Sequence, residues 1–158
     1  MTQEKKQEYT LRITQANKTQ MITILYEMVL DYIGDAMEAM ATSDRELVGR
    51  NLGYAQNCID ELIRSVNLKV DLGKMLHKIY IFSKKELMLA GINMNMQRLC
   101  RVQQNFKSLH NAYKEIEKVD TSEPTMGNIQ TVYAGLTYGR HSLNESVAAS
   151  SMNRGYKA

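Results

Sequence analysis

Residues Ile13 to Leu30 read ITQANKTQMITILYEMVL, and this stretch decides how the chain folds. Asn17 is suited to cap a helix, because its side-chain oxygen can accept from a backbone N–H that a helix start leaves unpaired. We therefore expect a helix from Lys18 to about Ala41. Apolar residues recur along it at intervals of three and four, which is typical of one buried helix face: Met21, Ile22, Leu25, Met28, Val29, Tyr32, Ile33, Ala36 and Met40.

The residues before this helix are mostly polar and charged. Tyr9, Leu11 and Ile13 are isolated apolar positions in residues 1–17. We therefore predict that residues 1–17 are a mobile N-terminal segment when they are not paired with anything.

A second helix should follow after a connection of only a few residues. Ser43 and Glu46 have the spacing of a capping box, in which the two side chains bond each other's backbone N–H groups. The short connection predicts an antiparallel neighbour for the first helix. Its expected buried side consists of Leu47, Asn51, Leu52, Ala55, Cys58, Ile59, Leu62, Ile63 and Val66. Gly49 and Gly53 fall inside this helix, where they allow either close approach or local bending.

A third helix is expected from Asp71, as its cap, to about Ala90, with Gly91 ending it in the left-handed conformation. Its inward stripe should consist of Leu72, Met75, Leu76, Ile79, Ser83, Leu87 and Ala90. Ile81 and Met88 lie nearly opposite that stripe. Tyr80, Phe82 and Leu89 lie on its flanks, with Lys84 and Lys85 among them. A helix that is apolar on most of its circumference must be covered or must bind something. Either a partner or one end of this chain would cover it.

A fourth helix from about Asn95 to Lys118 should bury Leu99, Val102, Phe106, Leu109, Tyr113 and Ile116. Together these patterns predict an all-α fold, an antiparallel four-helix bundle over residues 18–120. Residues 121–158 are richer in Gly, Ser, Thr and Asn and read as a C-terminal tail or appendage. One short amphipathic helix in this tail would contain Met126, Ile129, Val132, Tyr133 and Leu136.

The composition suits one globular domain: 158 residues, of which 44% are hydrophobic and 23% are charged. The 11 Met residues, with 9 Tyr and no Trp, favour soft apolar surfaces that adapt to different partners. Met also fills irregular gaps in a core. Cys58 and Cys100 lie on expected apolar faces and are interpreted as buried, reduced thiols. No signal peptide and no apolar run of about 20 residues is present, which indicates a cytoplasmic protein without membrane insertion.

The sequence offers little for catalysis, metal binding or nucleic-acid binding. His77, His110 and His141 are isolated, and no Glu-x-x-His pair or phosphate-binding glycine loop is present. The net charge of +3 comes from residues 69–118, which hold 10 Lys plus Arg against 4 Asp plus Glu. These cations are spaced along two helices, which is typical of a solvated face rather than of a nucleic-acid site. We predict neither an enzyme nor a cofactor.

The opening stretch resembles the N-terminal signature of the flagellin-specific export chaperones, the FliS family, which reads roughly V-x-T-A-S-P-E-E-L-x-x-M-L-Y-D-G-A-L. Residues of this chain stand at its matching positions: Ile13, Ala16, Asn17, Met21, Leu25, Tyr26, Glu27 and Leu30. Lys18 replaces the Pro and Met28 replaces the Gly. The segments IYIFSKKELMLAG and LHNAY are similar to later family segments, with Tyr113 in place of a Trp, so the resemblance covers roughly residues 9–118, including Tyr9.

This resemblance implies a helical-bundle chaperone that binds the disordered C-terminal region of flagellin and prevents premature polymerisation before export. The flagellar export apparatus is a further partner that it suggests. The client-binding residues would be Ile81, Met88, Tyr80, Phe82, Leu89, Lys84 and Lys85. The alternative is a helical adaptor or regulatory protein whose Met-rich face mediates homodimerisation. In either case one end of the chain, residues 1–17 or the C-terminal tail, is a candidate to cover the groove when no client is bound.

Overall fold

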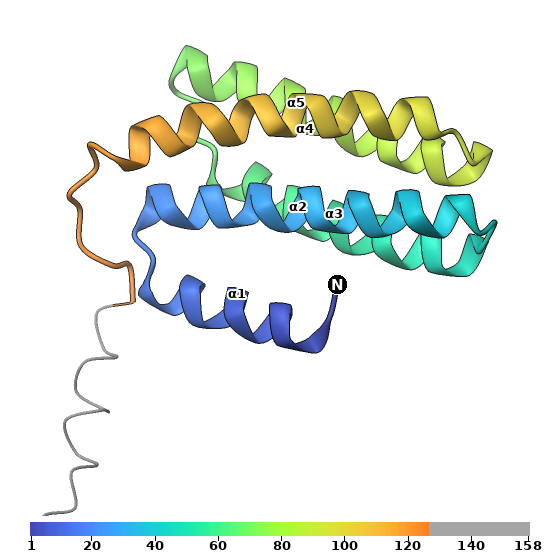
Figure 1. Cartoon of the computed structure of the whole chain (residues 1–158). Helices are drawn as coiled ribbons and strands as arrows, with labels where there is room; N and C mark the ends of the chain where they lie inside the picture. The colour runs from blue at the N-terminus through green and yellow to red at the C-terminus, as the bar shows by residue number, and fades with distance from the viewer. Residues whose placement is uncertain (127–158) are drawn as a thin grey trace, which may run out of the picture.

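The computed structural model describes residues 1–126, which form five helices and no strand. The helices are α1 (Gln3–Gln15), α2 (Lys18–Ala41), α3 (Arg45–Ser65), α4 (Asp71–Asn93) and α5 (Met96–Glu117). Each runs in the opposite direction to the one before it (Figure 1). The predicted all-α class is confirmed. The predicted count of four helices is too low, because the N-terminal residues add a fifth.

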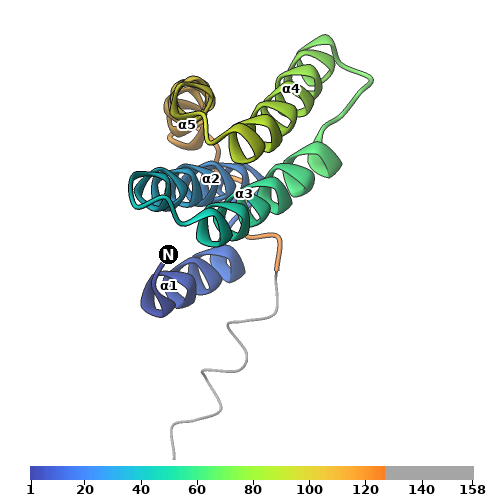
Figure 2. The same ribbon diagram turned by 90° about the vertical axis from the view of Figure 1, so that its right-hand side faces the viewer.

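The helices are arranged in layers, with α2 and α3 in the middle (Figure 2). On one side of this pair lie α4 and α5, and on the other side lies α1. Contacts join α2 to α1, α3 and α5, and they join α4 to α3 and α5. The main core therefore lies among α2, α3, α4 and α5, and α2 is the most enclosed helix. The fully buried residues of this main core include Val29, Ile33, Ile59, Leu87 and Phe106.

The predicted start and end of α2 are confirmed. Asn17 Oδ1 accepts from the backbone N–H of Gln20 at 2.8 Å, and the Gln20 side chain accepts from the backbone N–H of Asn17 at 2.9 Å. Two otherwise unpaired donors are thus satisfied, which sets the first turn of the helix. The helix then runs from Lys18 to Ala41 without interruption.

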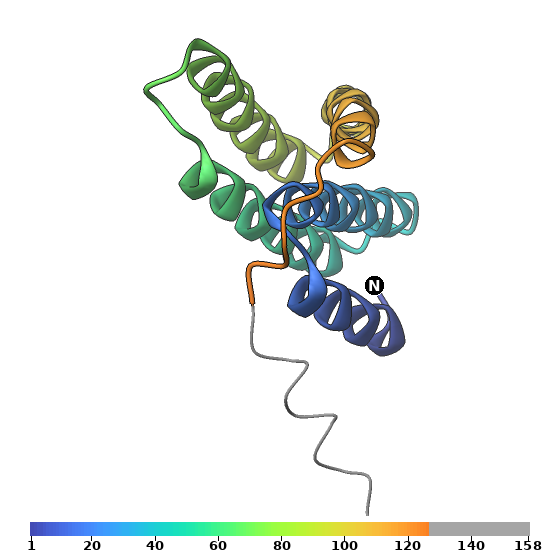
Figure 3. The same ribbon diagram turned by 90° about the vertical axis from the view of Figure 1, so that its left-hand side faces the viewer.

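The residues that we predicted as a mobile segment form α1, which packs on α2. The Thr2 side chain caps α1 by accepting from the backbone N–H of Lys5. Tyr9 and Ala16 are buried against Ile24 of α2 in a small second core. The polar sequence of residues 1–17 does not indicate this helix, because the residues that stabilise it lie on α2. Figures 2 and 3 place α1 on the far side of the middle layer from α4, so α1 does not cover α4.

The start of α3 differs from the predicted capping box. Asp44 is the cap, and its side chain accepts from the backbone N–H of Leu47 at 2.9 Å. Ser43 instead adopts a left-handed conformation with φ 57°, which turns the chain between the helices. Leu47, which was expected to be buried, is exposed, and its neighbour Val48 is buried instead, because Val48 lies on the same side of α3 as Leu52, Ala55 and Ile59.

Both ends of α4 need correction. Val70 precedes the helix without a side-chain cap, and Asp71 is the first helical residue. At the other end Gly91 lies inside the helix, and Met94 takes the left-handed position with φ 51°. A Cβ on Gly91 would lie 3.0 Å from Leu52 of α3, so this glycine allows close packing rather than a turn. A Cβ on Gly49 or Gly53 would meet no atom within 4 Å, so close approach does not explain those two glycines.

The predicted inward stripe of α4 is correct only in its second half. Leu76, Ser83, Leu87 and Ala90 are buried, whereas Leu72 and Met75 are 62% and 60% exposed. The reason is geometric, because the first turns of α4 diverge from the rest of the bundle (Figure 3). Helical periodicity continues past the point where the neighbouring helices end, so it cannot show where burial stops.

The bounds of α5 match the prediction to within a residue, with Asn95 as its cap. Leu99, Val102 and Phe106 are buried as expected, but Ile116 is exposed. The two cysteines differ: Cys58 is buried, and Cys100 is exposed, contrary to prediction. Burial, followed by the nearby charge of Glu61, raises the pKa of the Cys58 thiol to about 11. Ile129, Val132, Tyr133 and Leu136 of the predicted tail helix lie outside the described residues.

Candidate binding surface

Exposed apolar side chains run along α4 in two stripes. At about 100° per residue, Ile81, Met88 and Ile92 fall on the side of α4 towards α3, and Met75, Phe82 and Leu89 fall on the side towards α5. The flanking ion pairs fix these sides, because Lys84 bonds Asp60 of α3 and Glu86 bonds Arg98 of α5. Lys74, Lys78 and Lys85 lie between the stripes. We call these nine residues (Lys74, Met75, Lys78, Ile81, Phe82, Lys85, Met88, Leu89 and Ile92) the α4 outer face.

The structure brings most of the predicted binding residues together on this face. Ile81, Phe82 and Met88 are 48%, 49% and 51% exposed, and Lys85 is exposed beside them. Leu89 is half-buried. Such a row of large apolar side chains on one helix is costly in water unless something covers it.

Two of the predicted residues are placed differently. The Lys84 ammonium is held by both carboxylate oxygens of Asp60, at 2.6 and 2.7 Å, and so ties α4 to α3. Tyr80 lies in the core at 1% exposure, with its hydroxyl bonded to that of Tyr26. Tyr80 was expected on the edge of the exposed face, but α3 and α5 enclose its side of α4. A partner that covers the α4 outer face could reach Tyr80 only from the cavity at the start of α4, which Tyr80 helps to line.

The tyrosine cluster beneath α4 is a feature that the sequence did not indicate. The Tyr26 ring packs on Phe106 and Tyr113 at centroid distances of 5.7 and 5.3 Å. Burial raises the pKa of Tyr80 to about 12 and also raises that of Tyr26, so both hydroxyls stay protonated near neutral pH. The phenols therefore act as hydrogen-bonding core residues.

A cavity opens next to this cluster at the start of α4. It has a volume of about 200 Å³, and it is lined by Ile22, Ser65, Val66, Asn67, Val70, Leu72, Gly73, Leu76, Tyr80 and Tyr113. Leu72, which we had assigned to the core, forms part of its exposed rim. The apolar surface of α4 thus continues into a hollow large enough for an apolar side chain.

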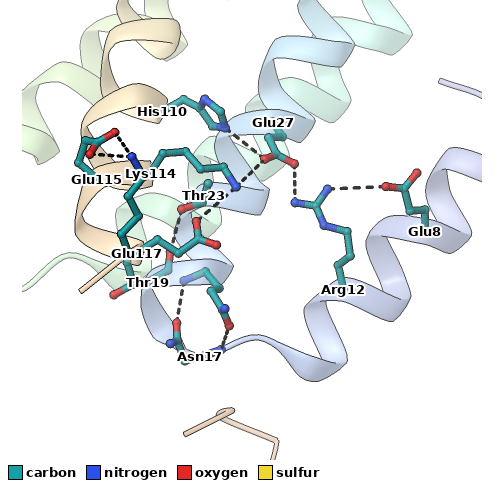
Figure 4. Close-up of polar contacts among 12 residues, drawn as sticks. Glu8, Arg12, Asn17, Thr19, Thr23, Glu27, His110, Lys114, Glu115 and Glu117 are labelled. Atoms are coloured by element: carbon teal, nitrogen blue, oxygen red, sulfur yellow. Dashed lines mark hydrogen bonds and ion pairs between the residues drawn. The ribbon is translucent and has the colours of Figure 1, made fainter. Parts of the chain in front are cut away.

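The ion pairs of Glu27 are the second feature that the sequence did not indicate. Its carboxylate lies 2.6 Å from Arg12 Nη2 of α1, 3.1 Å from His110 Nε2 and 3.6 Å from Lys114 Nζ, both of α5 (Figure 4). Burial alone would raise the pKa of Glu27, but the hydrogen bond from His110 and the guanidinium of Arg12 outweigh it and lower that pKa. One carboxylate therefore joins three helices. Glu27, Asp31 and Asp35 follow one another at intervals of four residues, and this acidic row on one side of α2 is the sequence signal that could have indicated a basic partner helix.

In a comparison with protein-family models, residues 1–120 match the family described as "Flagellar protein FliS". The chain belongs to the FliS family. FliS proteins are flagellar export chaperones, a class that is not known to be enzymatic. No curated protein matches the chain.

The FliS signature residues of this chain cap α2 and contribute to both cores. Asn17 caps α2, Leu25 and Tyr26 are in the main core, and Tyr9 and Ala16 are in the second core. Ile13, Met21 and Leu30 are half-buried around them. The Tyr9 hydroxyl donates to Asp31 at 2.6 Å, and burial together with this bond raises its pKa. In this FliS chain the signature is thus a structural element.

None of the helices of this FliS chain within residues 1–126 has the length and apolar content needed to cross a membrane.

Proposed function

We propose that this protein is a cytoplasmic flagellar export chaperone that binds the disordered C-terminal region of flagellin and so prevents premature polymerisation. The observation that carries this proposal is the pair of exposed apolar stripes on α4. A disordered client that folds on binding can cover a long face of this kind, while the entropic cost of ordering keeps the complex releasable. Delivery to the flagellar export apparatus is part of the same proposal.

The row of lysines between the stripes specifies the client further. Lys74, Lys78 and Lys85 would face the middle of a bound helix, where Asp or Glu residues would complement them. The same row disfavours the alternative that this face mediates homodimerisation, because two copies pairing through it would bring like charges together. Sedimentation of the free protein decides between the two: a monomer at micromolar concentration fits the chaperone.

The direct test is a titration of the full-length protein with the C-terminal peptide of the flagellin from its own organism. Calorimetry should show binding with a negative heat-capacity change, and circular dichroism should show a gain of helix. If both signals are absent at micromolar concentrations, the proposed function is wrong.

The double substitution Ile81→Ser with Met88→Ser tests the location of the site. Both side chains are about half exposed, so their burial under a client is worth about 1–3 kcal/mol in total, and client affinity should fall accordingly. The melting temperature should hardly change. The control is Leu11→Ser with Leu47→Ser, which removes exposed apolar side chains from α1 and α3 and should leave affinity unchanged. If the double substitution unfolds the protein and the remaining folded fraction binds the client as before, Ile81 and Met88 are core residues and not part of the site.

A further inference from the structure

The cavity at the start of α4 has walls from four helices. Ile22 comes from α2, Ser65 from α3, Leu76 from α4 and Tyr113 from α5. We call this hollow of about 200 Å³ the α4-start cavity. Large apolar side chains in its lining, or next to the lining residues along the chain, are at least half exposed: Leu68, Val70, Leu72 and Met75. So much apolar surface at one place is costly in water unless something covers it.

The polar groups of the cavity already have partners, so its occupant should be apolar. The Ser65 hydroxyl donates to a backbone carbonyl of α3, and the Asn67 side-chain oxygen accepts from the backbone N–H of Lys69. The Tyr80 hydroxyl is bonded to that of Tyr26. None of these groups requires a polar ligand. An aliphatic or aromatic side chain therefore fits the chemistry of the hollow.

Residues 119–126 hold the chain at the same end of the bundle as this cavity (Figure 3). The Thr125 N–H donates to the Ala16 carbonyl, and Asn17 donates to a backbone carbonyl of the same segment. Ile22 in the cavity wall follows Ala16 at a distance of about 9 Å along α2, at 1.5 Å per residue. An extended chain covers about 3.3 Å per residue, so a few residues after Thr125 are enough to reach the cavity.

The sequence that follows is typical of a segment that packs on something. Residues 124–139 contain no charged side chain, and no other uncharged stretch of this chain is as long. Segments that stay solvated are usually charged and poor in large apolar residues. Here apolar residues recur at intervals of three and four, as on one face of a helix. We call four of them the tail stripe: Ile129, Val132, Tyr133 and Leu136.

We propose that the tail stripe occupies the α4-start cavity in the free protein. The stripe supplies uncharged apolar side chains to an apolar hollow, and it would also cover the exposed rim. Because it follows a segment that is bonded beside the cavity, its effective concentration there can reach the millimolar range, so even weak docking is populated. Helix α1 cannot take this place, because it lies on the far side of the middle layer (Figure 2). The proposal concerns the free protein and does not depend on the client.

Methyl NMR of the full-length protein tests the proposal directly. Methyl groups of the stripe, on Val132 and Leu136, should show nuclear Overhauser contacts with cavity methyl groups on Val66 and Leu76. Dilution should leave these contacts unchanged, because docking within one chain does not depend on protein concentration. If the contacts are absent, or if they disappear on dilution because a second copy supplies the stripe, the proposal is wrong.

A substitution in the tail should be felt in the cavity. Val132→Ser with Leu136→Ser removes two apolar side chains of the stripe, so the methyl signals of Leu76 should shift. The matched control is Leu143→Ser with Val147→Ser, which makes the same kind of change after the stripe and should leave those signals in place. Equal shifts in the two double variants would contradict a specific role of the stripe.

The reverse substitution should be felt in the tail. Leu72→Ser changes a rim side chain that is 62% exposed, so the bundle should stay folded while the methyl signals of Val132 and Leu136 move towards their unfolded-chain positions. Leu11→Ser on α1 changes a side chain of similar exposure, 57%, and should not move them. If the stripe signals do not respond to Leu72→Ser, the stripe does not occupy this cavity.

Discussion

Glu27 is the residue on which the positions of α1, α2 and α5 depend together. The groups that face it come from two neighbouring helices: Arg12 from α1, and His110 and Lys114 from α5. Glu117 is bonded to the same Lys114 at 3.4 Å. Because the surrounding groups favour its ionised form, the pKa of Glu27 in the folded protein lies below its usual value of 4.5. Folding is therefore linked to the ionisation of this one side chain.

The substitution Glu27→Gln should lower the free energy of unfolding by about 1.5–3 kcal/mol at neutral pH, the usual range for hydrogen bonds to a charged group. A lowered folded-state pKa stabilises the protein above the unfolded-state pKa, and this contribution is lost as the pH falls through the folded-state pKa. The difference between wild type and variant should thus be full at neutral pH and shrink below about pH 4.5. Urea unfolding across this range measures it, and a difference that does not change with pH would show that the charge is not involved.

At the scale of a single helix, two glycines should respond oppositely to the same change. Gly53→Ala in α3 meets open space, so it should raise the free energy of unfolding by about 0.5–1 kcal/mol through the lower entropy of the unfolded chain. Gly73→Ala in α4 should be strongly destabilising, because its Cβ would lie 2.0 Å from the backbone oxygen of Asn67. Thermal unfolding of both variants checks this. A tolerated Gly73→Ala would mean that the connection from α3 to α4 can shift.

The start of α2 could be predicted because Asn17 and the apolar periodicity after it are local signals. The start of α3 was missed by one residue, since Ser43 and Asp44 are both good caps and only the left-handed conformation of Ser43 decides between them. Helix α1 could not be predicted, because a polar sequence shows nothing of the carboxylates that it meets on α2. Local sequence therefore defines a helix well where its stabilisation is local and poorly where it comes from a neighbour.

For the binding surface, Ile81, Phe82 and Met88 could be found because they fall outside the inward stripe. Tyr80 was predicted on the surface and is buried, whereas Leu72 was predicted in the core and is exposed. Both errors arise because the direction and extent of burial depend on where α3 and α5 lie. The cavity of about 490 Å³ between α1, α2 and α3 requires three helices to meet. No sequence pattern within one helix indicates it.

At the scale of the whole molecule, residues 119–126 cross from the end of α5 to the junction of α1 and α2 (Figure 3). Asn17 Nδ2 donates to the Ser122 carbonyl at 3.2 Å, and the Thr125 N–H donates to the Ala16 carbonyl at 3.0 Å.

Asn17→Asp keeps the cap of α2 but loses the donor to Ser122. We expect amide exchange of Thr125 to become faster by a few-fold, while the melting temperature changes little. Asn17→Ala, which also loses the cap, should lower the melting temperature by several degrees. Equal melting temperatures for the two variants would contradict this separation of roles.

The enclosed position of α2 has a consequence for biosynthesis. While the chain is being made, α1, α2 and α3 leave the ribosome first and can pair with their immediate neighbours. The Tyr26 hydroxyl stays without Tyr80 until α4 has been made, and the Tyr26 ring stays without Phe106 and Tyr113 until more than half of the described chain has followed. The nascent protein therefore spends part of its synthesis with one side of α2 uncovered. Recognition by general folding factors should concentrate on that side, and it should end when α5 emerges.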